Sequence, residues 1–202
     1  PFSLDVALVP RDNGLGCPTD VQHGPTTDMT ATVMDGTHGL KVPGGAQYVP
    51  HLGTLLVDAW INPIVAGGRA QTIAHKAFSW SLFLNKGGRL CFLATDYHLF
   101  RDPHVSSAPA VCSSTHITAG RWTHVAATLD GVSTTLYVDG VRDISAGLPV
   151  WLPLASLDGT LAVGPGDYTS GIMSGSNFIQ KCERLPWSAL PVISITIGSA
   201  TD

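Results

Sequence analysis

The acidic residues are the first place to look for chemistry, because glycoside hydrolases use two carboxylates placed on either side of the bond they break. The sequence has fourteen Asp but a single Glu, Glu183, and it contains no Asp-x-Asp pair. Two neighbouring glutamates are therefore impossible, while an Asp pair from separate segments stays open. No Gly-x-Ser-x-Gly elbow indicates a serine nucleophile either. We expect no catalytic residue and a protein that is not an enzyme.

One segment combines Asp and His at short spacing. TDYHLFRDPH (95–104) carries four candidate metal ligands, namely Asp96, His98, Asp102 and His104. Asp and His side chains suit zinc or another first-row metal. Calcium, which prefers oxygen ligands, could instead be held by Asp side chains and carbonyls from separate loops. The spacing matches no known ligand motif, so histidines that are merely solvated are the competing interpretation. Calcium is the one cofactor that the sequence leaves open.

Aromatic residues in irregular segments could form a platform for a sugar ring, with polar groups beside it. We predict a ligand site from five such residues: Trp151, Asp167, Tyr168, Tyr97 and Asn177. The competing interpretation is that loop aromatics cover the core, since burying ~150–250 Å² of aromatic surface stabilises a fold by itself. Trp60, Trp80 and Trp122 fall in strand-like segments and are predicted to belong to the core.

Four cysteines occur, and no two of them form a Cys-x-x-Cys pair, which excludes a zinc ribbon or a thioredoxin motif. An even number in a loop-rich β domain favours two disulfides and an oxidising compartment. Of the three pairings we favour Cys91–Cys112, which closes a short loop, and Cys17–Cys182, which ties two loops near the ends of the chain. Four reduced, buried thiols are the alternative. We expect a secreted or cell-surface protein.

The elements that position these residues are predicted to be strands. The composition, with 22 Gly, 14 Pro and few helix-forming residues, favours short strands joined by turns. Apolar and polar residues alternate in many segments, and Asn85–Gly88 and Asp130–Gly131 mark two hairpins. Residues 95–120 and 164–190 are predicted to be irregular. The net charge of −4 and the absence of a basic run exclude a nucleic-acid partner, and no apolar run reaches the ~20 residues of a membrane span.

Three segments resemble one known family. GRWTHVAATLDGVSTTLYVDGV (120–141) is similar to the central hairpin of laminin-G-like domains, whose superfamily includes pentraxins and concanavalin-type lectins. LLVDAWINP (55–63) and HGLKVPGGAQYVPHL (38–52) resemble the segments before that hairpin. The resemblance implies an all-β fold, an antiparallel two-sheet sandwich of the jelly-roll kind. It also implies a structural, hydrogen-bonded role for His124.

The resemblance is strongest over residues 38–164, whereas residues 165–202 are divergent. The closing strand pattern typical of the family is missing, and the turn after Trp60, Val65–Arg69, has none of the acidic or amide side chains of pentraxin calcium loops. We therefore expect one laminin-G-like domain over residues 1–202 without a double calcium site of the pentraxin type.

The expected function is non-catalytic recognition of a glycan or a glycoprotein outside the cell, as in a lectin or an adhesion module. One alternative is a structural protein–protein interaction domain that contacts neighbouring subunits of a larger surface assembly. A second alternative is a glycoside-acting enzyme on the same fold, which would need two carboxylates ~5–9.5 Å apart in one cleft.

Overall fold

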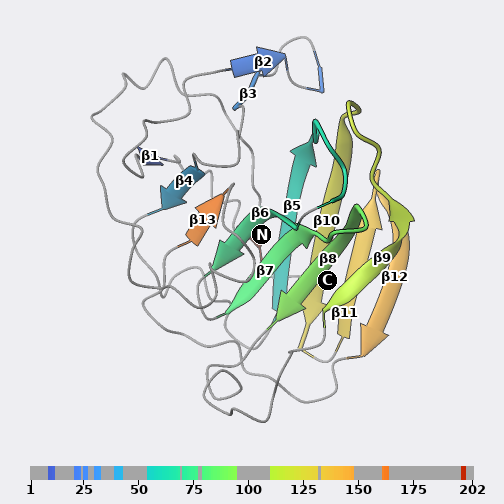
Figure 1. The fold of residues 1–202 in the computed structure, drawn as a ribbon. Coiled ribbons are helices and arrows are strands. Elements are labelled where there is room, and N and C mark those ends of the chain that lie inside the picture. The colour runs from blue at the N-terminus through green and yellow to red at the C-terminus, as the bar shows by residue number, and fades with distance from the viewer. Residues whose placement is uncertain are drawn as a thin grey trace.

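A computed structural model describes twelve parts of the chain. These are residues 9–11, 21–23, 25–26, 30–32, 39–42, 54–68, 70–76, 79–94, 110–131, 133–147, 161–163 and 197–198. Every regular element in them is a strand (Figure 1). The strands are β1 (Val9–Arg11), β2 (Val21–His23), β3 (Thr30–Thr32), β4 (Gly39–Val42), β5 (Thr54–Ile61), β6 (Gln71–Lys76), β7 (Trp80–Leu84), β8 (Arg89–Ala94), β9 (Val111–His116), β10 (Thr123–Asp130), β11 (Ser133–Val138), β12 (Val141–Gly147), β13 (Leu161–Val163) and β14 (Ile197–Gly198).

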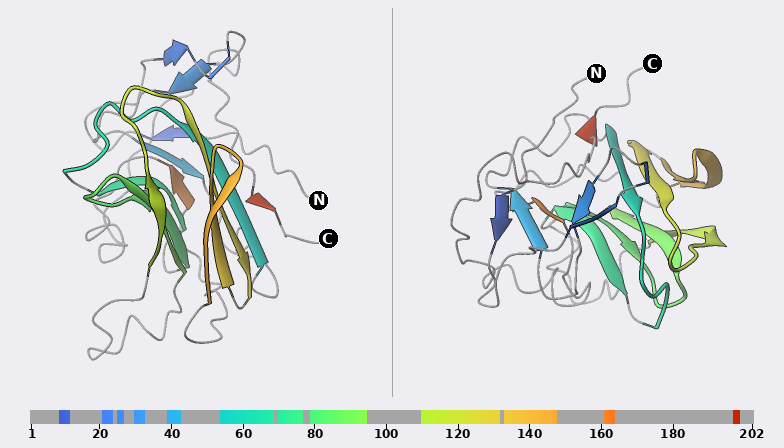
Figure 2. Two further views of the ribbon diagram at one scale, coloured as in Figure 1. Left: turned by 90° about the vertical axis from the view of Figure 1, so that its right-hand side faces the viewer. Right: turned by 90° about the horizontal axis from the view of Figure 1, so that it is seen from above.

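The strands form two large sheets that face each other, as the edge-on view in Figure 2 shows. The seven-stranded sheet has the order β1-β4-β13-β6-β7-β8-β9, and the five-stranded sheet has the order β12-β11-β10-β5-β14. All strand pairs in both sheets are antiparallel, and β2 and β3 form a separate hairpin. The predicted antiparallel two-sheet sandwich is confirmed.

The core lies between the two sheets and follows the alternation of the sequence. In β5, Leu55, Val57 and Ala59 are buried while the residues between them are more exposed. In the β10–β11 hairpin, Val125 pairs with Val138 and Ala127 pairs with Leu136, as the alternation predicts. The seven-stranded sheet contributes buried residues from four strands: Ala74, Trp80, Leu82, Leu84, Leu90, Phe92, Ala94 and Val163.

Two turns show why the sequence folds back where it does. In the β7–β8 turn, the Oδ1 atom of Asn85 accepts hydrogen bonds from the backbone N–H groups of Gly87 (2.8 Å) and Arg89 (3.1 Å). Between β11 and β12, Asp139 and Gly140 have φ angles of 51° and 75°. Positive φ at both central positions is the mark of a type I′ turn, for which Asp-Gly is a favoured pair.

Four of the described strands were not predicted from the sequence, namely β2 and β3 of the separate hairpin and the strands β9 and β12. β9 lies within residues 95–120, which were predicted to be irregular, and β12 follows the Asp139–Gly140 turn. Both are edge strands of polar composition, so neither carries an apolar period-two pattern. Asp143 of β12 joins them: its Oδ1 accepts from the Ser114 backbone N–H (2.5 Å), and its Oδ2 accepts from the Thr115 backbone N–H (3.0 Å). This carboxylate therefore connects the edges of the two sheets.

The prediction of three core tryptophans is only partly right. Trp80 is buried, as predicted, and Trp122 is half-buried just before β10 begins at Thr123. Trp60 is 44% exposed, so its assignment to the core was wrong. The physical reason is parity, because Leu55, Val57 and Ala59 point into the core and the next residue must point out.

Candidate functional site

The exposed indole of Trp60 is the natural starting point for a binding site among the described residues. It lies near the end of β5, on the face of the five-stranded sheet that points away from the core. Strand β10 runs antiparallel beside it, with His124 directly opposite Trp60 in the register. The centres of the two rings are 5.2 Å apart and the rings are tilted by 53°. The imidazole therefore supports one side of the indole.

His124 is held in turn by Asp58, two residues before Trp60. The Nε2 atom of His124 lies 3.0 Å from Oδ2 of Asp58, and both side chains are partly buried. An ionised carboxylate can only accept hydrogen bonds, so the Nε2 atom carries the proton and donates it. This is the hydrogen-bonded structural role expected for His124. The pair fixes the imidazole against Trp60 and leaves Oδ1 of Asp58 outside that hydrogen bond.

Asp139 and Arg121 complete the polar side of the site. Arg121 Nη2 donates to Asp139 Oδ2 over 2.7 Å, and the His124 backbone N–H donates to Asp139 Oδ1 over 3.0 Å. The backbone N–H of Asp139 donates to the His124 carbonyl over 2.7 Å. The β11–β12 turn is thus tied to the start of β10. We call Asp58, Trp60, Arg121, His124 and Asp139 the Trp60 site.

The loop after β5 lies at the same end of the sandwich, because it continues directly from Ile61 (Figure 1). Its Ile64 and Val65 side chains are 80% and 63% exposed. The Pro63 carbonyl accepts a hydrogen bond from the backbone N–H of Gly120, one residue before Arg121. The loop is therefore attached to the segment that carries the guanidinium group of the Trp60 site.

A family model for laminin G-type domains of the concanavalin A-like lectin/glucanases superfamily matches residues 35–177. This range covers more than two thirds of the chain. The chain belongs to this superfamily. The suspected laminin-G-like resemblance is thereby confirmed over the segments that carried it. A comparison of the sequence with curated proteins finds no match.

Solved structures similar to this laminin-G-like chain share its fold at low sequence identity. Domain 4 of a GH43 extracellular arabinanase from Geobacillus stearothermophilus, solved in complex with arabinotriose, is 16% identical with a TM-score of 0.54. That match covers 95% of this chain and 79% of the other. The binding domain of Paraclostridial Mosquitocidal Protein 1 is 12% identical with a TM-score of 0.53, over 81% and 45% of the two chains.

A botulinum neurotoxin shows the same fold. The binding domain of Botulinum Neurotoxin DC, in complex with SialylT, is 15% identical with a TM-score of 0.50. The match covers 73% of this chain and 37% of the other, so this laminin-G-like chain spans less than half of the toxin chain. These likenesses support the fold.

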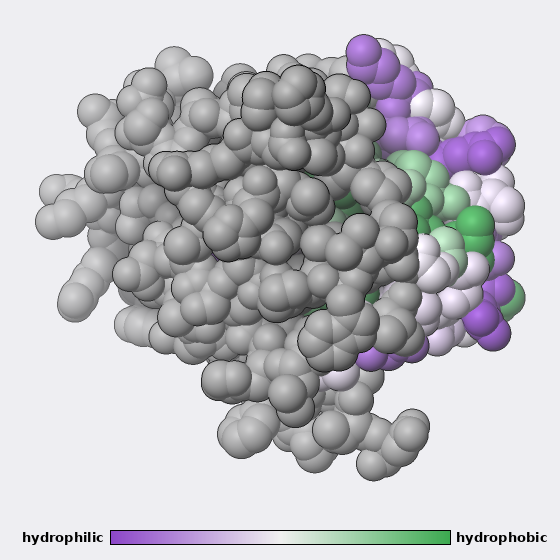
Figure 3. Space-filling view, turned by 90° about the horizontal axis from the view of Figure 1, so that it is seen from below, coloured by the Kyte–Doolittle hydropathy of each residue, from purple (hydrophilic) through white to green (hydrophobic). Residues whose placement is uncertain are grey.

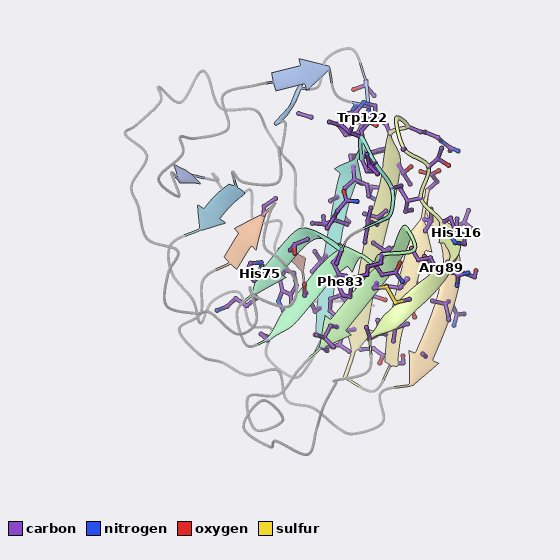
Figure 4. All side chains as sticks on the ribbon, in the orientation of Figure 1. His75, Phe83, Arg89, His116 and Trp122 are labelled. Carbon is purple, nitrogen blue, oxygen red and sulfur yellow. A yellow bond between two sulfur atoms is a disulfide. The ribbon has the colours of Figure 1, made fainter. Side chains whose placement is uncertain are left out.

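The opposite outer face of this laminin-G-like domain, on the seven-stranded sheet, has a different character. Phe83, Cys91 and Leu93 form a second buried apolar cluster there, with Cys112 packed against it. Cys91 and Cys112 are joined by a disulfide, the pairing favoured from the sequence. Figure 4 shows Phe83 and the disulfide on this face, with His75 to one side and Arg89 and His116 to the other.

Two side chains on this face bear on its electrostatics. Burial, with a smaller contribution from the adjacent Lys76 ammonium, lowers the pKa of His75 to about 4. The ring is therefore neutral at physiological pH. Arg89 Nε donates to Nε2 of His116 over 3.3 Å, across the β8–β9 pair. This contact requires an unprotonated Nε2 atom on His116.

Most of the site residues predicted from the sequence lie outside the described residues, and those predictions stay predictions. They are the ligand residues Trp151, Asp167, Tyr168, Tyr97 and Asn177, the metal ligands Asp96, His98, Asp102 and His104, and the second cysteine pair Cys17 and Cys182. Within the described ranges, no three His, Cys, Asp or Glu residues gather closely enough to hold a metal ion. No helix in these ranges is long and apolar enough to cross a membrane.

The sequence reasoning missed the Trp60 site, although two signals for it were present. The parity of β5 places Asp58 and Trp60 on the face opposite Leu55, Val57 and Ala59. The resemblance already implied a hydrogen bond for His124, so only the identity of the residue that it bonds to was missing. Asp58 lies 66 residues away in the sequence, and only the register of β5 against β10 brings the two together.

Proposed function

We propose that this laminin-G-like domain is a non-catalytic, extracellular recognition module that binds a glycan or a glycoprotein through the Trp60 site. The observation that carries the proposal is the 44% exposure of Trp60, near the end of β5 and beside a fixed imidazole–carboxylate pair. A large exposed aromatic ring is an unfavourable choice for a solvated strand position. A ligand that covers the ring would remove its apolar surface from water.

The chemistry of the Trp60 site suits a sugar. The apolar face of a pyranose or furanose ring can stack on the indole, while its hydroxyl groups need acceptors and donors around the rim. Asp58 and Asp139 supply carboxylate oxygens, and Arg121 supplies guanidinium N–H groups. These polar groups are held in place by hydrogen bonds before any ligand arrives, which lowers the entropy cost of binding.

Two similar structures support a sugar ligand by analogy. The arabinanase domain was solved with arabinotriose, and the botulinum neurotoxin binding domain was solved with SialylT. The disulfide between Cys91 and Cys112 supports an extracellular location, because such bonds persist in oxidising compartments.

The absence of catalysis is part of the proposal and rests on the carboxylates. The chain has one Glu, and the two carboxylates of the Trp60 site are already occupied. Asp58 bonds to His124, and Asp139 bonds to Arg121 and to the backbone. A glycoside hydrolase needs one carboxyl group that gives up a proton and a second that attacks or activates water. Two carboxyl groups that are already engaged in hydrogen bonds suit binding better than that cycle.

A glycan array followed by calorimetric titration tests this function. The domain should bind at least one class of glycan, and Trp60→Ala should weaken that binding by about tenfold or more through loss of stacking. Val141→Ala is the matched control, since Val141 is 69% exposed on β12 of the same sheet but is not part of the Trp60 site. The Val141→Ala variant should bind the glycan with the same affinity as the wild type.

Each failure has its own meaning. Glycan binding that survives Trp60→Ala would place the site elsewhere, and the five ligand residues predicted from the sequence would be the next to test. No detectable binding to any glycan on a broad array would contradict the proposed glycan-binding function. Absence of glycan binding together with reversible self-association would favour the structural protein–protein module instead. Turnover of a bound glycan would contradict the absence of catalysis.

A further inference from the structure

The loop between β5 and β6 presents an apolar surface that the Trp60 site does not explain. Ile64 and Val65, adjacent in sequence, are 80% and 63% exposed, the first being the most exposed large apolar side chain among the described residues. We call these two residues the apolar tip. Adjacent residues in a loop that are both this exposed protrude from the surface, so the tip forms a projection and not a groove.

The tip is held out by backbone contacts on both sides. Before it, the Pro63 carbonyl accepts from the Gly120 N–H over 2.9 Å; after it, the Gly68 N–H donates to the Lys86 carbonyl over 2.9 Å. The Gln71 side chain donates through Nε2 to the Val65 carbonyl over 2.6 Å. Because these bonds fix the loop at both ends and at the tip itself, the exposure of the two side chains is part of the folded structure.

Glycines are needed for this brace. Gly67 and Gly68 have φ angles of 130° and 78°, which side chains rarely allow. Gly88 approaches the loop so closely that a Cβ atom there would lie 2.8 Å from the Ala66 carbonyl oxygen. The loop and the β7–β8 turn therefore touch through backbone atoms, and the turn places Lys86 beside Gly67 and Gly68 of the same loop.

The size and the charge around the tip decide what kind of partner fits it. A stable protein interface usually buries ~1,200–2,000 Å² in total, far more than two aliphatic side chains supply. Lys86 is exposed next to the loop and forms no ion pair within the described ranges. Arg69 follows Gly68 in the sequence. A projecting aliphatic pair with an exposed lysine on the adjoining turn complements a bilayer whose headgroups are anionic.

We propose that the apolar tip inserts shallowly into the headgroup–acyl boundary of an anionic phospholipid bilayer. Ile64 and Val65 enter the apolar layer, and Lys86 stays at the level of the lipid phosphates. The inference does not depend on the glycan, since it uses side chains outside the Trp60 site for insertion.

Vesicle sedimentation tests the tip directly. The domain should sediment with vesicles of phosphatidylcholine and phosphatidylserine more than with phosphatidylcholine alone. The double variant Ile64→Thr/Val65→Thr keeps the β-branched shape and should lower the vesicle partition coefficient by about tenfold or more. Lys86→Ala should reduce the preference for anionic vesicles more than the binding to neutral ones.

Val141→Thr is the matched control, because Val141 is an equally exposed valine outside the loop. It should sediment like the wild type, and all variants should share its circular dichroism spectrum and unfolding midpoint. A wild type that stays in solution with both kinds of vesicle would overturn the proposal. A tip variant that sediments as well as the wild type would also overturn it. So would the finding that the tip is needed for self-association while the wild type does not bind vesicles.

Discussion

On both sheets of the sandwich, alternate side chains point away from the core, but these outer side chains are exposed on one sheet and buried on the other. On the five-stranded sheet, the side chains that point away from the core include the exposed Trp60 and the polar pair of His124 and Asp58. On the seven-stranded sheet, the corresponding side chains include Phe83, Cys91 and Leu93, and all three are buried. Alternation thus tells which face a side chain is on, while it does not tell whether that face meets water.

This difference in exposure suits the two faces to different roles. The buried face, with its disulfide, contributes to stability, whereas the exposed face is free to contact a ligand without loss of core packing. Figure 3 shows the sandwich from below, where the visible described residues include a hydrophobic group beside neutral and hydrophilic ones. The apolar tip and the Trp60 site lie at the other end.

The largest effect should come from removing an aromatic ring from each face in turn. Phe83→Ala should lower the free energy of unfolding by about 3–5 kcal/mol, because it leaves a cavity in a buried cluster. Trp60→Ala should cost less than about 1.5 kcal/mol, because much of its ring already contacts water. Urea unfolding under non-reducing conditions measures both. Equal losses for the two variants would contradict the division of tasks.

A smaller effect concerns His75 on the buried face. Because burial lowers its pKa to about 4, the folded protein binds fewer protons than the unfolded chain between pH 6.5 and 4. Stability from the neutral ring is therefore present above pH 6.5 and decreases as the pH falls through this window. The loss should amount to about 2–3 kcal/mol by pH 4. His75→Gln should remove this part of the pH dependence, as followed by urea unfolding at several pH values. An unchanged pH profile would show that His75 is more hydrated than the structure indicates.

The smallest effect concerns the contact that joins the two sheets at their edge. Burial is the largest single influence on the pKa of Asp143 and raises it, but the hydrogen bonds from Thr115 and Ser114 together outweigh burial and lower the pKa below its usual value. A lowered pKa means that the ionised form stabilises the fold above the unfolded value and that this contribution disappears as the pH falls through the folded value. Asp143→Asn should cost about 1 kcal/mol at neutral pH and less at an acidic pH, where part of the carboxylate is protonated. Thermal unfolding at both pH values measures the difference, and an equal cost at both would reject the ionic contribution.

The sequence was sufficient for the parts of the fold that carry strong local signals. The Asp130–Gly131 and Asn85–Gly88 turns, the alternation of β5 and β10, and the family resemblance all agreed with the structure. The edge strands β9 and β12 could not be predicted, because residues such as Ser114, Thr115 and Asp143 form strands only through their bonds to each other.

The Trp60 site shows the same limit for function. Trp60 was placed in the core because tryptophans in strands are usually buried, and only the parity of its own strand contradicts that. The hydrogen bond between Asp58 and His124 depends on long-range register, which no local pattern encodes. The residues that seemed most suitable for binding were those in irregular segments, where local patterns say least about position.

The brace of the β5–β6 loop has a practical consequence. On either side of Ile64 and Val65, the loop is attached through the carbonyls of Pro63 and Lys86 and the N–H groups of Gly68 and Gly120. None of these atoms belongs to a side chain of residue 64 or 65, and Gln71 bonds to the backbone carbonyl of Val65, so the loop geometry does not depend on which residues occupy these two positions. The two positions can be randomised together in a display library, and variants selected for a new affinity should keep the backbone conformation of the loop.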